Sequence, residues 1–154
     1  EPMKVWRIAS RKYAATAFSG EGAARYSGRW NSSGVPVVYL ATSMAVGILE
    51  ILVHVTDRSY LNAYVAIPVI VPDTSVEKLE PLPKDWQQLP EPYPESTQRV
   101  GTEWAMSLRT LALQVPSAIV PSEFNLVLNP KHPDMSKIKR GEPQPLVIDP
   151  RLLK

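Results

Sequence analysis

The chain has 154 residues, 44% of them hydrophobic and 21% charged, which is the composition of a globular protein and excludes general disorder. Its length fits one domain with a sizeable core, and its formal net charge of +2 is too small to indicate nucleic-acid binding. Because there is no cysteine, disulfides, thiolate nucleophiles and cysteine-bound zinc are excluded, and the composition fits a reducing cytoplasm.

The N-terminal segment predicts a strand. Glu1 and Pro2 stand before Met3 and resemble the remnant of an expression tag, so a single domain is expected over residues 3–154. MKVWRIA, residues 3–9, alternates apolar and polar side chains as a strand does. No signal-peptide pattern opens the chain, and the longest apolar stretch is far shorter than the roughly 20 residues of a membrane helix. We therefore expect a cytoplasmic protein without a membrane segment.

The next elements are short. Residues 10–35 are rich in glycine and small polar residues and are expected to be mostly loop. PVVYLA, residues 36–41, predicts a strand. Residues 43–55 predict a helix with Ser43 as its N-cap, and residues 62–71 predict a strand that is interrupted at Pro68.

Prolines dominate the second half, since the chain holds 16 prolines against 7 glycines. Residues 76–94 predict an irregular connection, because proline fixes φ and removes a backbone donor. A helix is expected over 95–113, followed by strands at 115–120, 124–129 and 145–149. This irregular alternation favours an α+β fold with mostly antiparallel small sheets and flanking helices. Neither a G-x-G-x-x-G motif after a strand nor a P-loop is present.

Glu50 is the sharpest signal for chemistry. In SMAVGILEILVHV, every residue from Met44 to Val53 is apolar or small except this one. A helix that is apolar nearly all round is buried, so we expect Glu50 to lie away from bulk water. A buried carboxylate must find a cation or donors, or stay protonated. A structural arginine or an edge position on the helix would satisfy it equally well.

The stretch YSGRWNSSG, residues 26–34, places a permanent charge in a polar turn. The guanidinium of Arg29 suits bidentate phosphate contacts and stacks on aromatic faces such as Trp30, and Gly28 allows close approach of a ligand. The structural alternative is a surface arginine stacked on Trp30. Tyr39 is the only polar tip in PVVYLA and is alternatively a core tyrosine bonded to backbone.

A third cluster lies in VPSAIVPSEFNLVLNP, residues 115–130. Ser117 lies between a proline and an alanine, and Asn125 and Asn129 share one face of the expected strand. These groups either orient a polar ligand or satisfy backbone groups in a proline-rich region. His132 has no second histidine at ligand spacing, so no metal site is expected.

Taken in order, these pieces resemble the RES-domain toxins of bacterial type II toxin–antitoxin systems, a family named after an arginine, a glutamate and a serine. The three positions here are Arg29 in SGRWN, Glu50 in ILEILVH and Ser117 in VPSAIVPSEFNLVLNP. The phrases KVWRIA, GRWNSSGVPVVYLATS and NPKHPD match as well. The resemblance covers nearly the whole chain, from Met3 to about Asp149.

The resemblance implies a fold and a set of partners. RES toxins are similar in fold to ADP-ribosyltransferases of the diphtheria-toxin type, and they consume NAD as a substrate, so no cofactor is expected. A cognate antitoxin of a helix-turn-helix class blocks the active site and supplies the DNA binding of the complex. This chain is therefore expected to bind NAD and an antitoxin, and neither DNA nor a membrane.

The resemblance also implies catalytic roles. Cleavage of the nicotinamide–ribose bond passes through an oxocarbenium-like centre, and nicotinamide leaves as a neutral molecule without a general acid. Glu50 is expected to stabilise the positive charge and to hold the ribose hydroxyls. Arg29, beside Gly28 and Trp30, is expected to clamp the pyrophosphate, with Arg7 as a second candidate.

The remaining residues are expected to contact or support the dinucleotide. Tyr39 is expected to pack its ring against nicotinamide or ribose, and Ser117 to hydrogen-bond the dinucleotide. Asn125 or Asn129 would support the loop geometry or bind NAD. A Rossmann motif is not expected, because NAD is a substrate here and not a hydride carrier.

Two questions stay open at the level of sequence. The ADP-ribose acceptor is water, inorganic phosphate or a side chain of a target protein. The alternative to an enzyme is a non-catalytic module whose pocket binds a nucleotide or a partner, and Glu50 distinguishes the two because only catalysis needs its charge. A DNA-binding protein is disfavoured by the scattered basic residues.

Overall fold

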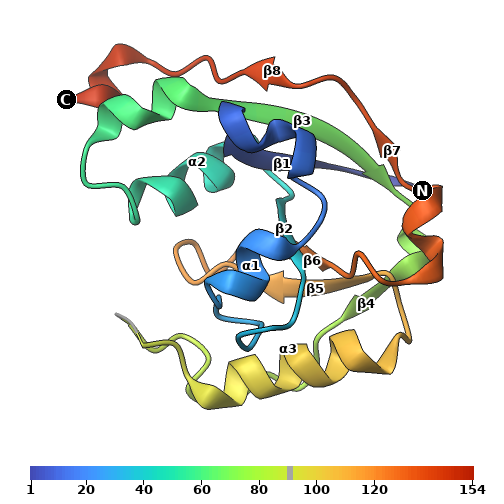
Figure 1. Cartoon of the computed structure of the whole chain (residues 1–154). Coiled ribbons are helices and arrows are strands. Elements are labelled where there is room, and N and C mark those ends of the chain that lie inside the picture. Colours follow the sequence, from blue (N-terminus) through green and yellow to red (C-terminus); the bar gives the residue numbers. More distant parts are fainter. Residues whose placement is uncertain (90–91) are drawn as a thin grey trace.

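The computed structural model of the chain describes residues 1–89 and 92–154, and in these residues eight strands form one curled sheet (Figure 1). The strand order is β4-β5-β6-β2-β1-β3-β7, with β8 also pairing with β3. The strands are β1 Met3–Ser10, β2 Val38–Ala41, β3 Tyr64–Val71, β4 Val76–Lys78, β5 Ala112–Pro116, β6 Phe124–Leu128, β7 Lys139–Arg140 and β8 Gln144–Pro145. Of these pairs only β4–β5 is parallel. The α+β class and the mostly antiparallel pairing are confirmed, but the strands join in one sheet where several small ones were expected.

Helices flank the sheet. They are α1 Glu21–Arg25, α2 Met44–Leu52 and α3 Glu95–Ser107, with 3-10 helices η1 Arg11–Thr16, η2 Arg58–Ala63, η3 Asp73–Ser75, η4 Pro133–Lys137 and η5 Pro150–Leu153. In Figure 1, α2 lies beside β1 and β2, and α3 runs below β4 and β5. In the described part of the chain, no helix is long and apolar enough to cross a membrane.

Two hydrophobic clusters lie on opposite faces of the sheet, because successive side chains of a strand alternate between faces. Val38 and Leu40 of β2 belong to the cluster that includes Val5 of β1. Tyr39 packs against the other cluster, which includes Trp104 of α3 and Trp30. The sheet is thus covered on both sides, and the face that carries Tyr39 also receives α3.

The N-terminal elements largely follow the sequence. β1 is as predicted to within one residue, and residues 10–35 are mostly irregular, with η1 and α1 inside them. Helix α2 begins after Ser43, whose Oγ accepts a hydrogen bond from Val46 N, as predicted, but it ends at Leu52 rather than at residue 55.

Pro68 does not interrupt its strand, contrary to the prediction. It pairs with Trp6 of β1, and its carbonyl oxygen accepts a hydrogen bond from Gly141 N on the other side. On that side β7 pairs with Val69 and Ile70, and β8 pairs with residues 65 and 66. The missing N–H of the proline therefore falls in the gap between two short edge strands, where no ladder bond is lost.

The predicted helix over 95–113 was too long. Leu108 has φ 56°, in the left-handed region, and ends α3 at Ser107. Leu113 lies in β5, and Met106 near the end of α3 is 74% exposed. The apolar residues at the end of α3 and at the start of β5 follow one another closely in the sequence, so the pattern predicted one long helix in place of a helix and a strand.

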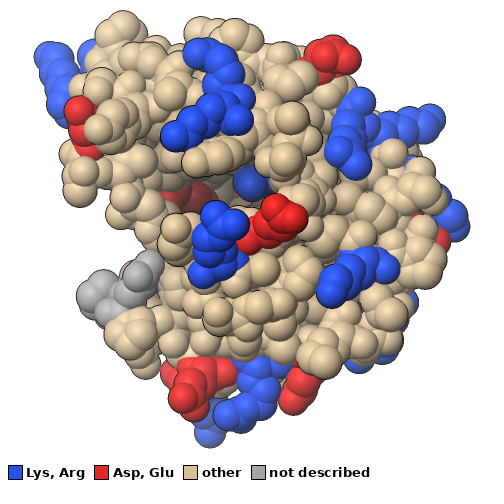
Figure 2. Space-filling view, viewed as in Figure 1, with Lys and Arg blue, Asp and Glu red and all other residues tan. Residues whose placement is uncertain are grey.

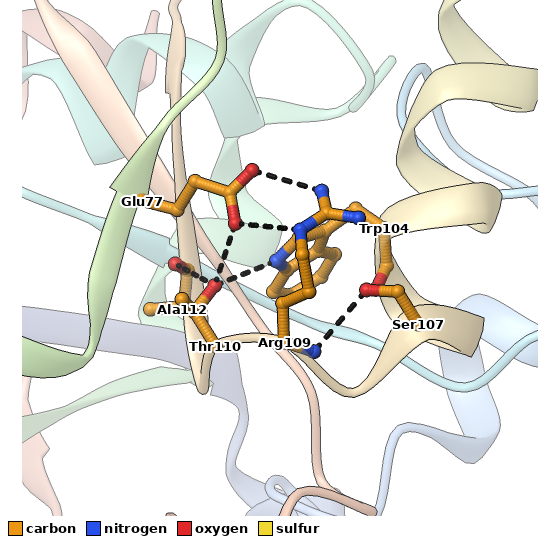
Figure 3. A network of polar contacts seen from close by, with 6 residues as sticks. All are labelled: Glu77, Trp104, Ser107, Arg109, Thr110 and Ala112. Atoms are coloured by element: carbon orange, nitrogen blue, oxygen red, sulfur yellow. Dashed lines mark hydrogen bonds and ion pairs between the residues drawn. The ribbon is translucent and has the colours of Figure 1, made fainter.

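A polar network fixes this helix-to-strand turn (Figure 3). Ser107 Oγ donates to Trp104 O and accepts from Arg109 N, while Trp104 Nε1 donates to Thr110 Oγ1 at 2.9 Å. Arg109 binds both carboxylate oxygens of Glu77, and Thr110 Oγ1 donates to the same carboxylate. Because Glu77 belongs to β4, the network also holds β4 beside β5, in the parallel pair that the sequence did not predict.

Three further boundaries differ from the predictions. β5 ends at Pro116, so most of the expected strand over 115–120 belongs to a loop. Only Gln144–Pro145 is extended near the end of the chain, where a strand over 145–149 was expected. The expected connection at 76–94 begins with β4, and its residues 90 and 91 lie outside the described residues.

Gly101 allows α3 to touch the loop that carries Arg29. A Cβ atom at this position would overlap the carbonyl group of Trp30. Gln98 Nε2 donates to Gly28 O at 3.0 Å, and Ser32 N donates to Thr102 Oγ1 at 3.0 Å. Residues 98–102, little more than one turn of α3, therefore anchor residues 28–32.

We predict that Gly101→Ala lowers the free energy of unfolding by about 3 kcal/mol, because the added methyl group meets rigid backbone. Gly22→Ala in α1 is the matched control, since nothing lies within 4 Å of a Cβ there. It should be neutral or stabilising by up to about 1 kcal/mol. Urea denaturation measures both, and equal effects of the two substitutions would contradict the close packing of α3 on the loop.

Candidate active site

Glu50 lies on a helix that is only partly buried. Helix α2 docks on the sheet through Gly47, where a Cβ atom would meet Ile8 and Ala41, and its buried residues are Val46 and Gly47. Glu50 is partly buried one turn later, whereas Leu49 is 40% exposed. The prediction of a helix buried all round is wrong, because an apolar sequence is compatible with an exposed surface as well as with a core.

The Glu50 carboxylate is held by neutral donors. Ser117 Oγ donates to Glu50 Oε1 at 2.6 Å, and Asn125 Nδ2 donates to the same oxygen at 3.0 Å. Within residues 1–89 and 92–154, Glu50 makes no ion pair, so a structural arginine is not its partner. Oε2 accepts no hydrogen bond from these residues and is the oxygen that remains for a ligand.

Ser117 is fully buried, with 0% exposure. It follows β5, and its N–H donates to Glu123 O at 2.9 Å, which closes the loop between β5 and β6. Its Oγ accepts hydrogen bonds from Ile119 N and Val120 N, both at 3.1 Å, in a local serine turn. The hydroxyl proton then points to Glu50.

Asn125 reaches Glu50 because of the register of the sheet. It pairs with Ala41 of β2 and with Val115 of β5, while Tyr39 pairs with Val127. Asn125 and Tyr39 are therefore diagonal neighbours on one face of adjacent strands. Asn125 Oδ1 is buried and has no hydrogen-bond partner among the described residues.

Tyr39 ties the loop of residues 28–31 to β2. Its hydroxyl donates to Asn31 Oδ1 at 2.6 Å and accepts from Trp30 N at 3.1 Å. The backbone at Gly28 lies so close that a Cβ atom there would be 2.6 Å from this hydroxyl oxygen. Gly28 thus permits the close approach of the Tyr39 hydroxyl group.

Burial strongly raises the pKa of Tyr39, and the positive charge of the nearby Arg29 opposes this shift. The hydroxyl is consequently protonated at neutral pH and serves as a hydrogen-bond donor. Arg29 directly precedes Trp30, whose N–H donates to this hydroxyl, so the backbone beside Arg29 is bonded to Tyr39.

Arg29 is partly buried and bound to the segment before α3. Its Nη1 donates to Trp86 O at 2.8 Å and to Gln88 O at 3.1 Å. Its guanidinium lies 5.1 Å from the ring centre of Tyr93, in cation–π range. The stacking partner is thus Tyr93; Trp30 is 3% exposed and packs in the core with Trp104.

Two residues that the sequence suggested for NAD binding, Arg7 and Asn129, form their hydrogen bonds away from Glu50. Arg7 donates to Ala17 O and Ile8 O, both at 2.9 Å, and burial lowers the pKa of its guanidinium. Asn129 is 2% exposed; its Nδ2 donates to Ala105 O of α3, and its Oδ1 accepts from Lys131 N. Asn129 therefore fastens α3 to the end of β6, at a distance from the Glu50 contacts.

Sequence reasoning missed Asn31, which is fully buried. Its side chain bonds Gly28, Tyr39, Ala23 and Val35 and so builds the loop that carries Arg29. The only signal was its place two residues after Arg29. The carbonyl groups that hold Arg29 were missed as well, since backbone acceptors leave no trace in a sequence.

The surface is hollowed near these elements. In the view of Figure 2, a hollow separates the half that carries α2, β1 and β3 from the half that carries α1 and α3, and acidic and basic groups are visible in its depth. A separate cavity of about 360 Å³ lies at the β4–β5 edge. It is lined by Lys78, Leu79, Glu80, Leu82, Trp86, Gln114, Pro116, Pro121 and Phe124. Glu50 and Tyr39 do not line it.

The arrangement combines a carboxylate oxygen, a tyrosine ring and a guanidinium on one side of the sheet. A carboxylate in a partly desolvated site stabilises a cationic centre, and a guanidinium binds a phosphate through parallel hydrogen bonds. Among the residues described, no group of three or more histidine, cysteine, aspartate or glutamate side chains is placed to hold a metal ion.

Two relatives match over nearly their full length. "Toxin Res" of Yersinia enterocolitica serotype O:8 / biotype 1B is 39% identical over 153 residues, which cover 97% of this chain and 99% of the relative. "Prs ADP-ribosylating toxin" of Sphingobium sp. (strain YBL2) is 42% identical over 157 residues, which cover 97% of this chain and 96% of the relative.

The fold also matches a solved structure. The crystal structure of the M. tuberculosis MbcT–MbcA toxin–antitoxin complex aligns with a TM-score of 0.73 over 96% of this chain and 85% of the matched chain, at 23% identity. This match establishes a shared fold. The RES domain model matches residues 4–149, and the chain therefore belongs to the RES domain family.

Proposed function

We propose that this chain is a toxin that cleaves the nicotinamide–ribose bond of NAD⁺ and transfers ADP-ribose to an acceptor. The observation that carries the proposal is the Glu50 carboxylate, which is held through Oε1 while Oε2 stays open, on the sheet face shared with Tyr39. The names of the two relatives support the same activity, because one is called an ADP-ribosylating toxin and the other a toxin.

The reaction needs a single carboxylate. The glycosidic C–N bond breaks, its electron pair neutralises the pyridinium nitrogen, and nicotinamide leaves without a proton donor. The positive charge moves to the ribose, where the carboxylate of Glu50 stabilises it and accepts a hydrogen bond from a ribose hydroxyl. The acceptor then attacks C1′ and loses its proton to solvent. NAD⁺ is thus a substrate, and no cofactor takes part.

Arg29 is proposed to bind the pyrophosphate. Both of its hydrogen bonds to the described residues come from Nη1, so Nε and Nη2 are available for two parallel bonds to phosphate oxygens. The carbonyls of Trp86 and Gln88 hold the guanidinium in place for this contact. Tyr39, whose hydroxyl is occupied by Asn31 and Trp30, offers its ring to nicotinamide or ribose.

A cognate antitoxin of the helix-turn-helix class is the proposed partner. The matched fold comes from a toxin–antitoxin complex, which supports a partner of this kind. Leu49 and Val53 of the α2 region are 40% and 56% exposed beside Glu50 and supply apolar area for such a contact. An antitoxin seated there would cover the carboxylate and stop NAD⁺ from entering. We place the reaction in the cytoplasm, where NAD⁺ is available.

We predict that the purified chain, freed of any partner, releases nicotinamide from NAD⁺ and that Glu50→Gln lowers kcat by about 100-fold or more, because the amide lacks the charge that stabilises the ribosyl cation. Chromatographic measurement of nicotinamide, with phosphate and with cell lysate present, gives the rates. Glu103→Gln, at an exposed position of α3, is the control and should keep the wild-type rate.

Binding of NAD⁺ to the Glu50→Gln variant separates catalysis from simple recognition. Calorimetry should show affinity close to that of the wild type, since the amide keeps the shape of the carboxylate. Tight binding without any nicotinamide release by the wild-type chain would instead identify a non-catalytic nucleotide-binding module.

We further predict that Arg29→Lys raises KM for NAD⁺ by about tenfold or more with a smaller effect on kcat, because lysine loses the planar fork that binds two phosphate oxygens. Arg25→Lys, at an exposed position of helix α1, is the matched control. A change confined to kcat would remove Arg29 from pyrophosphate binding.

The acceptor is identified by incubating the chain with isotopically labelled NAD⁺ in cell lysate. A labelled protein in the mass spectrum indicates ADP-ribosyl transfer to a target, ADP-ribose 1″-phosphate indicates phosphorolysis, and free ADP-ribose indicates hydrolysis. We expect a labelled protein, by analogy with the name of the Sphingobium relative.

A further inference from the structure

We propose that Ser117 and Asn125 are positioning residues that act through Glu50 and do not contact the dinucleotide. They bind one carboxylate oxygen so that the other faces the ribose. This inference rests on the proposed function, because it assigns roles within the same site. It changes the role expected for Ser117 from its sequence, which was a direct hydrogen bond to NAD.

Ser117 has no capacity left for a substrate. Its Oγ accepts two backbone hydrogen bonds and donates one to Glu50, which uses both acceptor lone pairs and the only donor of a hydroxyl group. Its side chain is also inaccessible, with 0% exposure. The two N–H groups polarise the hydroxyl and strengthen its bond to the carboxylate, which is short at 2.6 Å.

Asn125 approaches the same oxygen from a different strand. Its Nδ2 lies 3.0 Å from Glu50 Oε1, so two donors from separate parts of the chain converge on one atom. Glutamate has three rotatable side-chain bonds, and α2 is packed on the sheet by few buried residues. Without these two donors the carboxylate would sample several orientations, whereas with them Oε2 has a defined direction.

The unpaired Oδ1 of Asn125 supports a functional reason for this residue. A buried acceptor without a partner costs stability, and this cost offsets the stability that the bond from Nδ2 to Glu50 contributes. The neighbours of Asn125 in the sheet, Ala41 and Val115, are apolar. The amide therefore serves its one hydrogen bond, the bond to Glu50.

The test compares Ser117→Ala and Asn125→Leu with the wild type in nicotinamide release and thermal unfolding. We expect each substitution to lower kcat by about 10- to 100-fold, because a misdirected catalytic group loses this much, and to leave KM for NAD⁺ within about twofold. Asn125→Leu should change Tm little, because the loss of the bond to Glu50 and the loss of the unpaired acceptor oppose each other. Ser117→Thr, which retains the hydroxyl, should recover part of the rate.

A matched control removes a buried hydroxyl elsewhere. Thr97 of α3 is 0% exposed, and its Oγ1 donates to Pro94 O at 2.9 Å. Thr97→Val should lower Tm without changing kcat by more than about twofold, since its hydroxyl does not touch Glu50. Equal kinetic losses for Thr97→Val and Ser117→Ala would show that general destabilisation explains both and would overturn the inference.

A double-substitution cycle decides whether the two residues act through Glu50. In a Glu50→Ala background, measured at high enzyme concentration, Ser117→Ala should cause no further loss, because no carboxylate remains to be positioned. An undiminished additional loss, or a rise in KM as the main effect, would show an independent contact with the substrate. A wild-type chain that releases no nicotinamide would remove the proposed function and the inference together. An active wild type with unimpaired Ser117→Ala and Asn125→Leu variants would overturn the inference alone.

Discussion

The antiparallel pairing of β2 with β6 is the constraint on which the candidate site depends. It places Ala41 opposite Asn125 and Tyr39 opposite Val127, so that the amide and the tyrosine ring share one face. Side chains alternate along a strand, and a shift of one residue between β2 and β6 would place Tyr39 and Asn125 on opposite faces of the sheet. The same strand β6 pairs with β5, which delivers Ser117 to this face. The apolar residues between these positions, on the other face, hold the register.

The two charged groups of the site are held by different means. The carboxylate of Glu50 accepts hydrogen bonds from a side chain of β6 and from a side chain of the loop after β5. Glu50 itself belongs to α2, a helix with few buried residues. The guanidinium of Arg29 donates to backbone carbonyls of an irregular segment. The loop to which Arg29 belongs is anchored on α3. Tyr39 joins the loop of Arg29 to the sheet that carries Asn125. The hydrogen bonds of this tyrosine thus connect the two halves of the site.

Local patterns predicted much of the fold and the residue types of the site. Alternation identified β1, and an N-cap serine identified the start of α2. The predictions lost accuracy where a boundary depends on tertiary contacts. The end of α3 is set by Leu108 in a left-handed conformation and by the Glu77 network, and neither leaves a local pattern. The apolar helix α2 was expected in the core, but part of it is exposed. Which of its residues are exposed depends on the elements that pack against it.

The sequence by itself determined the family, the α+β class and the order of Arg29, Glu50 and Ser117 along the chain. Only the tertiary structure decided which of these residues meet. Glu50 bonds to residues 67 and 75 positions away, while Arg29 turns to carbonyls 57 and 59 positions away. The order of residue types along the chain does not identify such long-range partners, because strand register and helix docking determine which residues meet. For the same reason the sequence identified Ser117 as a polar residue with a role, but only its burial behind Glu50 shows that this role is exerted on another side chain.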